Sequence, residues 1–182
     1  VDAGAEFGYM AADITRTYPS SGHFTVLQRR AYEIVLRAQE CAISAVKPGA
    51  TLEEVHQTAL LELISGLRDL EILSGSDDEI LKAESYKKYY MHRTSHWLGM
   101  DVHDVGAYFI DGKPRPLMSG MVLTVEPGLY FAADDPAIPV GLRDVGIRIE
   151  DDILVTPTGC ENLSQSIFKT VEAIELAMSR SA

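Results

Sequence analysis

The sequence predicts an α+β fold in which helices cover one face of a curved antiparallel sheet. Three observations predict it. A hairpin-like segment opens the chain, two long amphipathic helical patterns follow between residues 25 and 67, and strand-like runs with turn residues prevail after residue 90. The 182 residues suffice for one large domain whose core buries about 70% of the unfolded surface.

The first segment is rich in strand signals. From Glu6 to Thr17, alternating and aromatic residues predict the two arms of a hairpin. Because its first arm begins at residue 1, we expect that the sequence lacks an upstream partner strand. The run 19–22, Pro-Ser-Ser-Gly, is a loop by composition.

Two helices come next, and each begins at a capping box. Thr25 with Gln28 starts the first helix, Thr51 with Glu54 starts the second, and the turn 47–49 separates them. Helical spacing puts their apolar residues on one face each: Leu27, Ala31, Ile34, Ala38, Cys41, Ala42 and Ala45, then Val55, Ala59, Leu60, Leu63, Ile64 and Leu67. The short turn predicts that the helices lie side by side.

The later elements are mostly strands. Residues 76–79 can cap a short helix. Strands are expected at 121–125, 129–131 and 146–156, a turn at 157–159, and a last helix at 170–178.

Charge and cysteine content narrow the partners. The net charge is −11 and the pI is near 4.8, which argues against a nucleic-acid partner. No apolar run approaches the ~20 residues that span a bilayer, so no membrane partner is expected. Cys41 and Cys160 have neither zinc nor disulfide spacing, and no signal peptide is visible, which predicts reduced thiols in a cytoplasmic protein.

Five chemically active side chains occupy strand-like positions, where a core-facing carboxylate is costly unless it is paired or bound to metal. They are Asp2, Asp13, His96, Glu126 and Glu150. Four carboxylates and one imidazole suit two hard divalent ions such as manganese better than a structural zinc ion. A two-metal site activates water for attack on a carbonyl.

Each of these residues also has an ordinary interpretation. Asp2 could be a hydrogen-bond acceptor in a turn, and Asp13 a surface residue or the partner of Arg16. Glu126 could stand at the entry to a loop, and the run 150–152 could be a solvated acidic face. His96 could be a hydrogen-bonded histidine of the core. We further expect His23 and His56 on the surface and Trp97 as packing support beside His96.

Five ordered blocks, at 1–4, 12–17, 92–106, 122–130 and 146–152, carry these residues. With them, the sequence from residue 1 to about 178 resembles the catalytic domain of the creatinase/aminopeptidase metallopeptidases, which share the "pita-bread" fold. It is most similar to their Xaa-Pro aminopeptidase (aminopeptidase P) branch. Residues 1–182 would then be part of one catalytic domain. The resemblance implies that its upstream strand and helices, a further substrate-contacting histidine and an N-terminal domain are missing.

The resemblance implies a role for each site residue. Asp2 would hold one metal ion, Asp13 and Glu150 would bridge two, and His96 and Glu126 would hold the second; manganese is the expected metal. Glu126 would also shuttle the proton of the attacking water.

Four further residues are implied to support catalysis. His103 would steady the substrate carbonyl, His92 would line the pocket for the residue after the cleaved bond, and Tyr130 and Arg148 would support the site by hydrogen bonds. Period-two spacing puts Arg148 and Glu150 on one strand face independently of any family. Gly99 and the β-rich context favour loop and strand over helix for 92–103.

The implied activity is removal of the N-terminal residue from peptides with proline second, by a protein that is a homo-oligomer. Three alternatives remain open. A prolidase acting on Xaa-Pro dipeptides shares fold and ligands, and a methionine aminopeptidase is a weaker match. An inactive fragment or metal-free peptide-binding module is the third.

Overall fold

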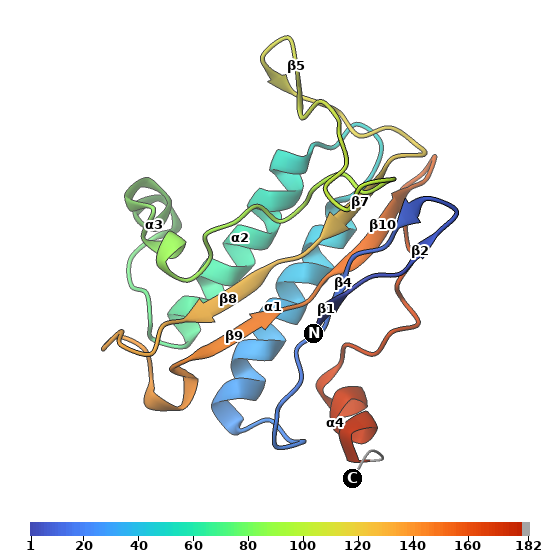
Figure 1. The fold of residues 1–182 in the computed structure, drawn as a ribbon. Helices are drawn as coiled ribbons and strands as arrows, with labels where there is room; N and C mark the ends of the chain where they lie inside the picture. Colours follow the sequence, from blue (N-terminus) through green and yellow to red (C-terminus); the bar gives the residue numbers. More distant parts are fainter. Residues whose placement is uncertain (180–182) are drawn as a thin grey trace.

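The computed structural model describes residues 1–179, and its two long helices, Val26–Ala45 and Leu52–Asp69, lie behind a curved antiparallel sheet (Figure 1). In chain order the elements are β1 (Asp2–Ala3), β2 (Glu6–Phe7), β3 (Met10–Ala11), β4 (Ile14–Thr15), α1 (Val26–Ala45), α2 (Leu52–Asp69), α3 (Asp77–Ala83), the 3₁₀ turn η1 (Ser85–Lys88), β5 (Phe109–Ile110), β6 (Lys113–Pro114), β7 (Val122–Val125), β8 (Gly128–Phe131), the 3₁₀ turn η2 (Val140–Leu142), β9 (Val145–Arg148), β10 (Asp151–Val155), β11 (Cys160–Asn162) and α4 (Val171–Ser179).

The predicted helix starts are confirmed. Full capping boxes precede α1, α2 and α3, at Thr25, Thr51 and Ser76. In each, the side chain of the cap and that of the residue three positions later satisfy amides that the first turn leaves free. The expected C-terminal helix is α4. No helix among the described residues is long and apolar enough to cross a membrane.

The helices pack on the sheet through two clusters of buried apolar side chains. Helices α1 and α2 lie side by side, and at their contact a Cβ on Gly66 would lie 2.2 Å from Ile34 Cγ2. Glycine at this position therefore lets the helices approach closely. In each cluster, fully buried side chains from the helices meet side chains from the strands. The first cluster includes Tyr32, Val35, Leu63, Leu129 and Ile147, and the second includes Val55, Ala59, Leu123 and Ile153.

The opening hairpin is confirmed and is longer than predicted. β1 pairs with β4 and β2 with β3, all antiparallel. Gly8 and Tyr9 both have positive φ, at 60° and 65°, as a tight hairpin turn requires. A Cβ on Gly4 would lie 1.6 Å from the Ala12 carbonyl oxygen, so only glycine fits there. The pairing sets Asp2 opposite Thr15.

The central strand pair is interrupted at the two glutamates. β7 pairs with β10 up to Val125 and Asp151, and β8 with β9 from Gly128 and Arg148, in one continuous register. The expectation of one strand over 146–156 is therefore wrong at 149–150. The cause lies across the pair: Pro127 has no N–H to donate, so only one long bond of 3.4 Å, from Ile149 N–H to the Pro127 carbonyl, joins the strands there.

The amides of the two glutamates point outward, to the neighbouring segments of the sheet. Glu126 N–H donates to the Thr94 carbonyl at 2.8 Å, and Glu150 N–H donates to the Thr15 carbonyl at 3.1 Å. The register therefore sets Glu126 and Glu150 opposite each other as a non-hydrogen-bonded pair, in which side chains come closest. Carboxylate oxygens of the two residues accordingly come within 4.8 Å of each other.

Candidate metal centre

The five predicted ligands converge from five separate segments. Asp2 lies in β1, whereas the other four lie in irregular backbone beside a strand, so their expected strand positions are wrong in detail. Donor atoms within 4.8 Å of one another form three overlapping groups: Asp2, Asp13 and Glu150; His96, Glu126 and Glu150; and Asp13, His96 and His103. Each predicted ligand belongs to at least one group.

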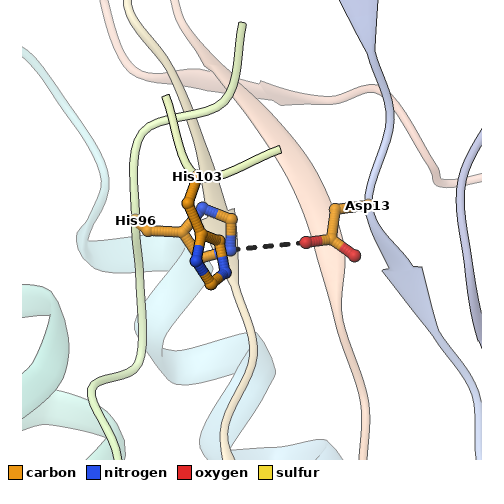
Figure 2. Close-up of side chains that lie close together, drawn as sticks. All are labelled: Asp13, His96 and His103. Carbon is orange, nitrogen blue, oxygen red and sulfur yellow. Dashed lines mark ion pairs between the residues drawn. The ribbon is translucent and has the colours of Figure 1, made fainter. Parts of the chain in front are cut away.

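His96 presents one ring nitrogen to the carboxylates (Figure 2). Its Nε2 lies 3.4 Å from Asp13 Oδ2 and 3.5 Å from Glu126 Oε1. Its Nδ1 lies 3.0 Å from the Trp97 carbonyl oxygen, which only accepts, so Nδ1 carries the proton and donates. This tautomer leaves the Nε2 lone pair free, as a metal ligand requires.

Glu150 is held from three sides. Thr15 Oγ1 donates to its Oε2 at 2.6 Å, and Arg16 Nη1 donates to its carbonyl at 2.6 Å. Only 1% of the residue is exposed. Burial, together with the nearby charge of Glu126, raises the pKa of Glu150 to about 9.

The pKa values of Glu126 and Asp13 are raised as well. Burial raises the pKa of Glu126 to about 7, and Asp13 and Asp2 add to that effect while Arg148 opposes it. Burial and the neighbouring Asp2 likewise raise the pKa of Asp13. Carboxylate oxygens crowded together with one imidazole nitrogen form a donor set that fits hard divalent cations, whose charge would let all of them ionise.

The donors line a cavity of about 480 Å³. His92, His103 and Arg148 line it too, together with Arg93, Ser95 and Tyr108. The His103 ring lies edge-on against that of His96, with centroids 4.2 Å apart (Figure 2). His103 therefore lies beside the predicted ligands, with a ring nitrogen within 4.8 Å of an Asp13 oxygen, and also lines the cavity.

His92, Tyr130, Arg148 and Asp2 form one hydrogen-bonded chain. His92 Nδ1 donates to the Arg93 carbonyl at 2.8 Å, so its Nε2 accepts from the Tyr130 hydroxyl at 2.7 Å. Arg148 Nη1 lies 3.5 Å from that hydroxyl, and its Nη2 donates to Asp2 Oδ2 at 2.5 Å. Burial lowers the pKa of His92, which keeps this imidazole neutral.

The acidic run 150–152 is buried, which excludes its interpretation as a solvated face. Asp151 and Asp152 are 0% and 5% exposed. Arg16 pairs with Asp151 at 2.6 Å, and therefore not with Asp13. Burial disfavours the charge of Asp151, but Lys169 at 2.8 Å and Arg16 outweigh it and lower its pKa.

Several supporting residues were not predicted. Thr15 accepts from Arg148 Nε at 3.1 Å while donating to Glu150. Asp152 Oδ2 accepts the backbone N–H of Asp13 at 3.2 Å, and burial raises the pKa of Asp152 to about 6. Neither residue had a sequence signal for this role, because the partners lie more than 130 residues away.

The expectation of a surface position for His56 is wrong. It is 7% exposed, and its Nδ1 lies 2.8 Å from Thr94 Oγ1, the same hydroxyl that meets Tyr90. Burial lowers the pKa of His56 to about 4. A signal existed: His56 stands four residues before Leu60 on the apolar face of α2. His23 is exposed and Trp97 is buried in the core, as predicted.

The model of metallopeptidase family M24 matches residues 1–157. The chain belongs to this family. Among curated M24 relatives, it is 48% identical to the Xaa-Pro aminopeptidase of Escherichia coli (strain K12), over 98% of this chain and 40% of that protein. It is 43% identical to the Xaa-Pro aminopeptidase of Haemophilus influenzae, over 98% and 41%. The chain thus spans about two fifths of the length of these relatives.

Solved structures agree with the sequence comparison. Aminopeptidase PepP of Pseudomonas aeruginosa is 46% identical with a TM-score of 0.96, over 99% of this chain and 41% of that one. Zinc-substituted Escherichia coli aminopeptidase P in complex with product is 48% identical with a TM-score of 0.93, over 100% and 41%. The α+β, pita-bread expectation is confirmed, and a divalent metal centre agrees with both family and neighbours.

Proposed function

We propose that this chain forms the metal-binding part of an exopeptidase that hydrolyses the bond between an N-terminal residue and a following proline. The observation that carries the proposal is the convergence of five ligands from five segments in one cavity of about 480 Å³. The Xaa-Pro aminopeptidase names of the relatives support the substrate class. Residues 1–182 are proposed to be part of one catalytic domain.

The proposed site takes two divalent ions, with manganese as the proposed metal. Asp2 would hold one, His96 and Glu126 the other, and Asp13 and Glu150 would bridge them, as the donor groups allow. When bound, such ions polarise the scissile carbonyl and lower the pKa of water.

The side chains of the chain itself supply the proton chemistry. With the ions bound Glu126 would be a carboxylate, and as such it would take a proton from water and pass it to the leaving nitrogen. His103 lies where an N–H can reach a developing oxyanion beside His96. Neutral His92, fixed by Tyr130, forms a wall for the proline ring, and Arg148 keeps Asp2 in place.

The cellular setting is part of the same proposal. Cys41 and Cys160 are both free, which supports a reducing, cytoplasmic environment. A homo-oligomer is proposed from the resemblance, and light scattering on the full natural chain tests it.

The experiment compares peptides on the full natural chain loaded with manganese. A tripeptide with proline second should lose its first residue, and the same peptide with alanine second should not. Elemental analysis after desalting should find about two ions per chain. Glu126→Gln should lower kcat by about a thousandfold, whereas the exposed Glu161→Gln in β11 should not change it.

Three results would contradict the proposal. Full activity of Glu126→Gln would show that Glu126 is not the proton shuttle. Near-zero bound metal would show that the five residues do not form a metal centre. Cleavage of Xaa-Pro dipeptides alone, with tripeptides untouched, would show a prolidase instead.

A further inference from the structure

A second cavity opens beside the metal cavity and shares part of its wall. Its volume is about 350 Å³. Arg93, Ser95 and Tyr108 line both cavities. The rest of the wall comes from the first turn of α2 and from the β5–β6 hairpin, through Leu52, Glu53, Phe109 and Pro114. A molecule in the metal cavity can therefore extend into the second one along a continuous surface.

Ser95 stands at the boundary with a hydroxyl that no described residue satisfies. The residue is 7% exposed, and its Oγ has no hydrogen-bond partner among residues 1–179. Buried hydroxyls are normally hydrogen-bonded. The neighbouring Thr94 hydroxyl, by contrast, meets both His56 and Tyr90. Ser95 lines both cavities, but its Oγ is itself covered, so it can bond a peptide group that crosses from one to the other once the Ser95 side chain rotates toward them.

One wall of the second cavity is the exposed side chain of Phe109, on a hairpin whose base is anchored to the core. Phe109 is 60% exposed. Its neighbour Tyr108 packs against Trp97 with ring centroids 5.6 Å apart, and the Tyr108 carbonyl accepts from Arg115 N–H at 2.8 Å. The Arg115 guanidinium lies over the Trp97 ring. The base of the hairpin is thus anchored to the buried Trp97, and binding need not first order this wall.

Two opposite charges in the wall of the second cavity neutralise each other. Arg93 donates to Glu53 in an ion pair, and both residues line the cavity. With these two neutralised, the remaining lining apart from Ser95 is apolar or aromatic: Leu52, Tyr108, Phe109 and Pro114. Such a wall favours an apolar side chain over an acidic or basic one.

We propose that the second cavity binds the side chain of the third residue of the peptide, and that it prefers a large apolar one. This inference rests on the proposed function. The side chain of the third residue packs between Leu52 and Phe109, and Ser95 Oγ bonds the peptide backbone at the boundary. His92, which precedes Arg93, faces the proline in the metal cavity, so the next residue reaches the shared wall.

The test uses two tetrapeptides with proline second that differ only at the third residue, glycine or leucine. The full natural chain loaded with manganese should cleave the leucine peptide with about tenfold higher kcat/KM. Phe109→Ala should reduce this ratio below about threefold. The control is Phe7→Ala, because Phe7 is 91% exposed on the β2–β3 hairpin and lines neither cavity; it should keep the ratio. Ser95→Ala should lower kcat/KM for both peptides about fivefold and leave their ratio unchanged.

The outcomes separate this inference from the proposed function. If the wild type cleaves neither tetrapeptide, the proposed function fails. If it cleaves both equally, or if Phe109→Ala keeps the preference for leucine, the second cavity does not bind the third residue and only this inference is overturned.

Discussion

Replacing Thr15 by valine removes one buried hydroxyl that serves two site residues. Thr15 is 4% exposed, donates to Glu150 Oε2 at 2.6 Å and accepts from Arg148 Nε at 3.1 Å. Valine has nearly the same shape, so packing is preserved while both bonds are lost. Thr58→Val is the matched control, because within residues 1–179 the one bond of the Thr58 hydroxyl is to the Glu54 carbonyl of α2, at 2.8 Å.

The magnitude follows from the charge of Glu150 in the two states. Without metal its pKa is about 9, so the carboxyl is protonated at pH 7, whereas metal binding requires the carboxylate. A hydrogen bond contributes about 1 kcal/mol with a neutral partner and about 1.5–3 kcal/mol with a charged one. The hydroxyl therefore favours the metal-bound state by about 0.5–2 kcal/mol, or about 2- to 30-fold in affinity.

Competition with a chelator of known affinity measures this difference. At pH 7, Thr15→Val should bind Mn²⁺ about 2- to 30-fold more weakly than the wild type, and Thr58→Val should match the wild type. The Thr15 hydroxyl lowers the pKa of Glu150, so its loss should also shift the pH dependence of binding upward. Circular dichroism checks that both variants fold. Equal affinity of a folded Thr15→Val protein would refute this role for the hydroxyl.

Two further predictions concern buried charge. Arg16→Met removes one of the partners of the buried Asp151 carboxylate and should lower the free energy of unfolding, measured in urea, by about 3–5 kcal/mol. Arg29→Met, which breaks an exposed ion pair, should leave the urea midpoint unchanged. Equal urea midpoints for the two variants would contradict the argument. In the metal-free protein, burial raises the pKa of Glu126 to about 7 and that of Glu150 to about 9 from 4.5. As the pH rises, the unfolded chain loses these protons before the folded protein does. The free energy of unfolding should therefore fall as the pH rises from 4.5 to 9, by at most about 1.4 kcal/mol per pH unit for each proton. Urea unfolding at pH 5, 7 and 9 with chelator checks this; a flat profile would contradict it.

The helices were predictable because their signals are local. Capping residues such as Thr25 and Thr51 act within one turn, and the apolar faces repeat at helical spacing. His56 shows the limit of reading single residues. Its spacing to Leu60 places it on the apolar face of α2, yet the residue type alone predicts a surface position. Only the packed structure supplies its partner, Thr94.

The residues proposed as metal ligands could be singled out from the sequence, whereas the residues that support them could not. The ligands stand in long ordered blocks that resemble a family, so their types and order carry the information. The roles of Thr15 and Asp152 depend on contacts across more than 130 residues, which no local pattern encodes. The interruption at 149–150 likewise depends on Pro127 in another strand.

The register of the central strands explains why this centre needs a cation. Because pairing continues from Val125–Asp151 to Gly128–Arg148, Glu126 stands directly opposite Glu150. Like charges at such a position are destabilising. Burial raises the pKa of both glutamates, and the charge of Glu126 adds to the effect at Glu150, so without metal the pair retains protons. A divalent ion instead relieves the repulsion between the like charges by neutralising both carboxylates. The same backbone register that builds the core of the sheet therefore makes proton release and metal binding one coupled event.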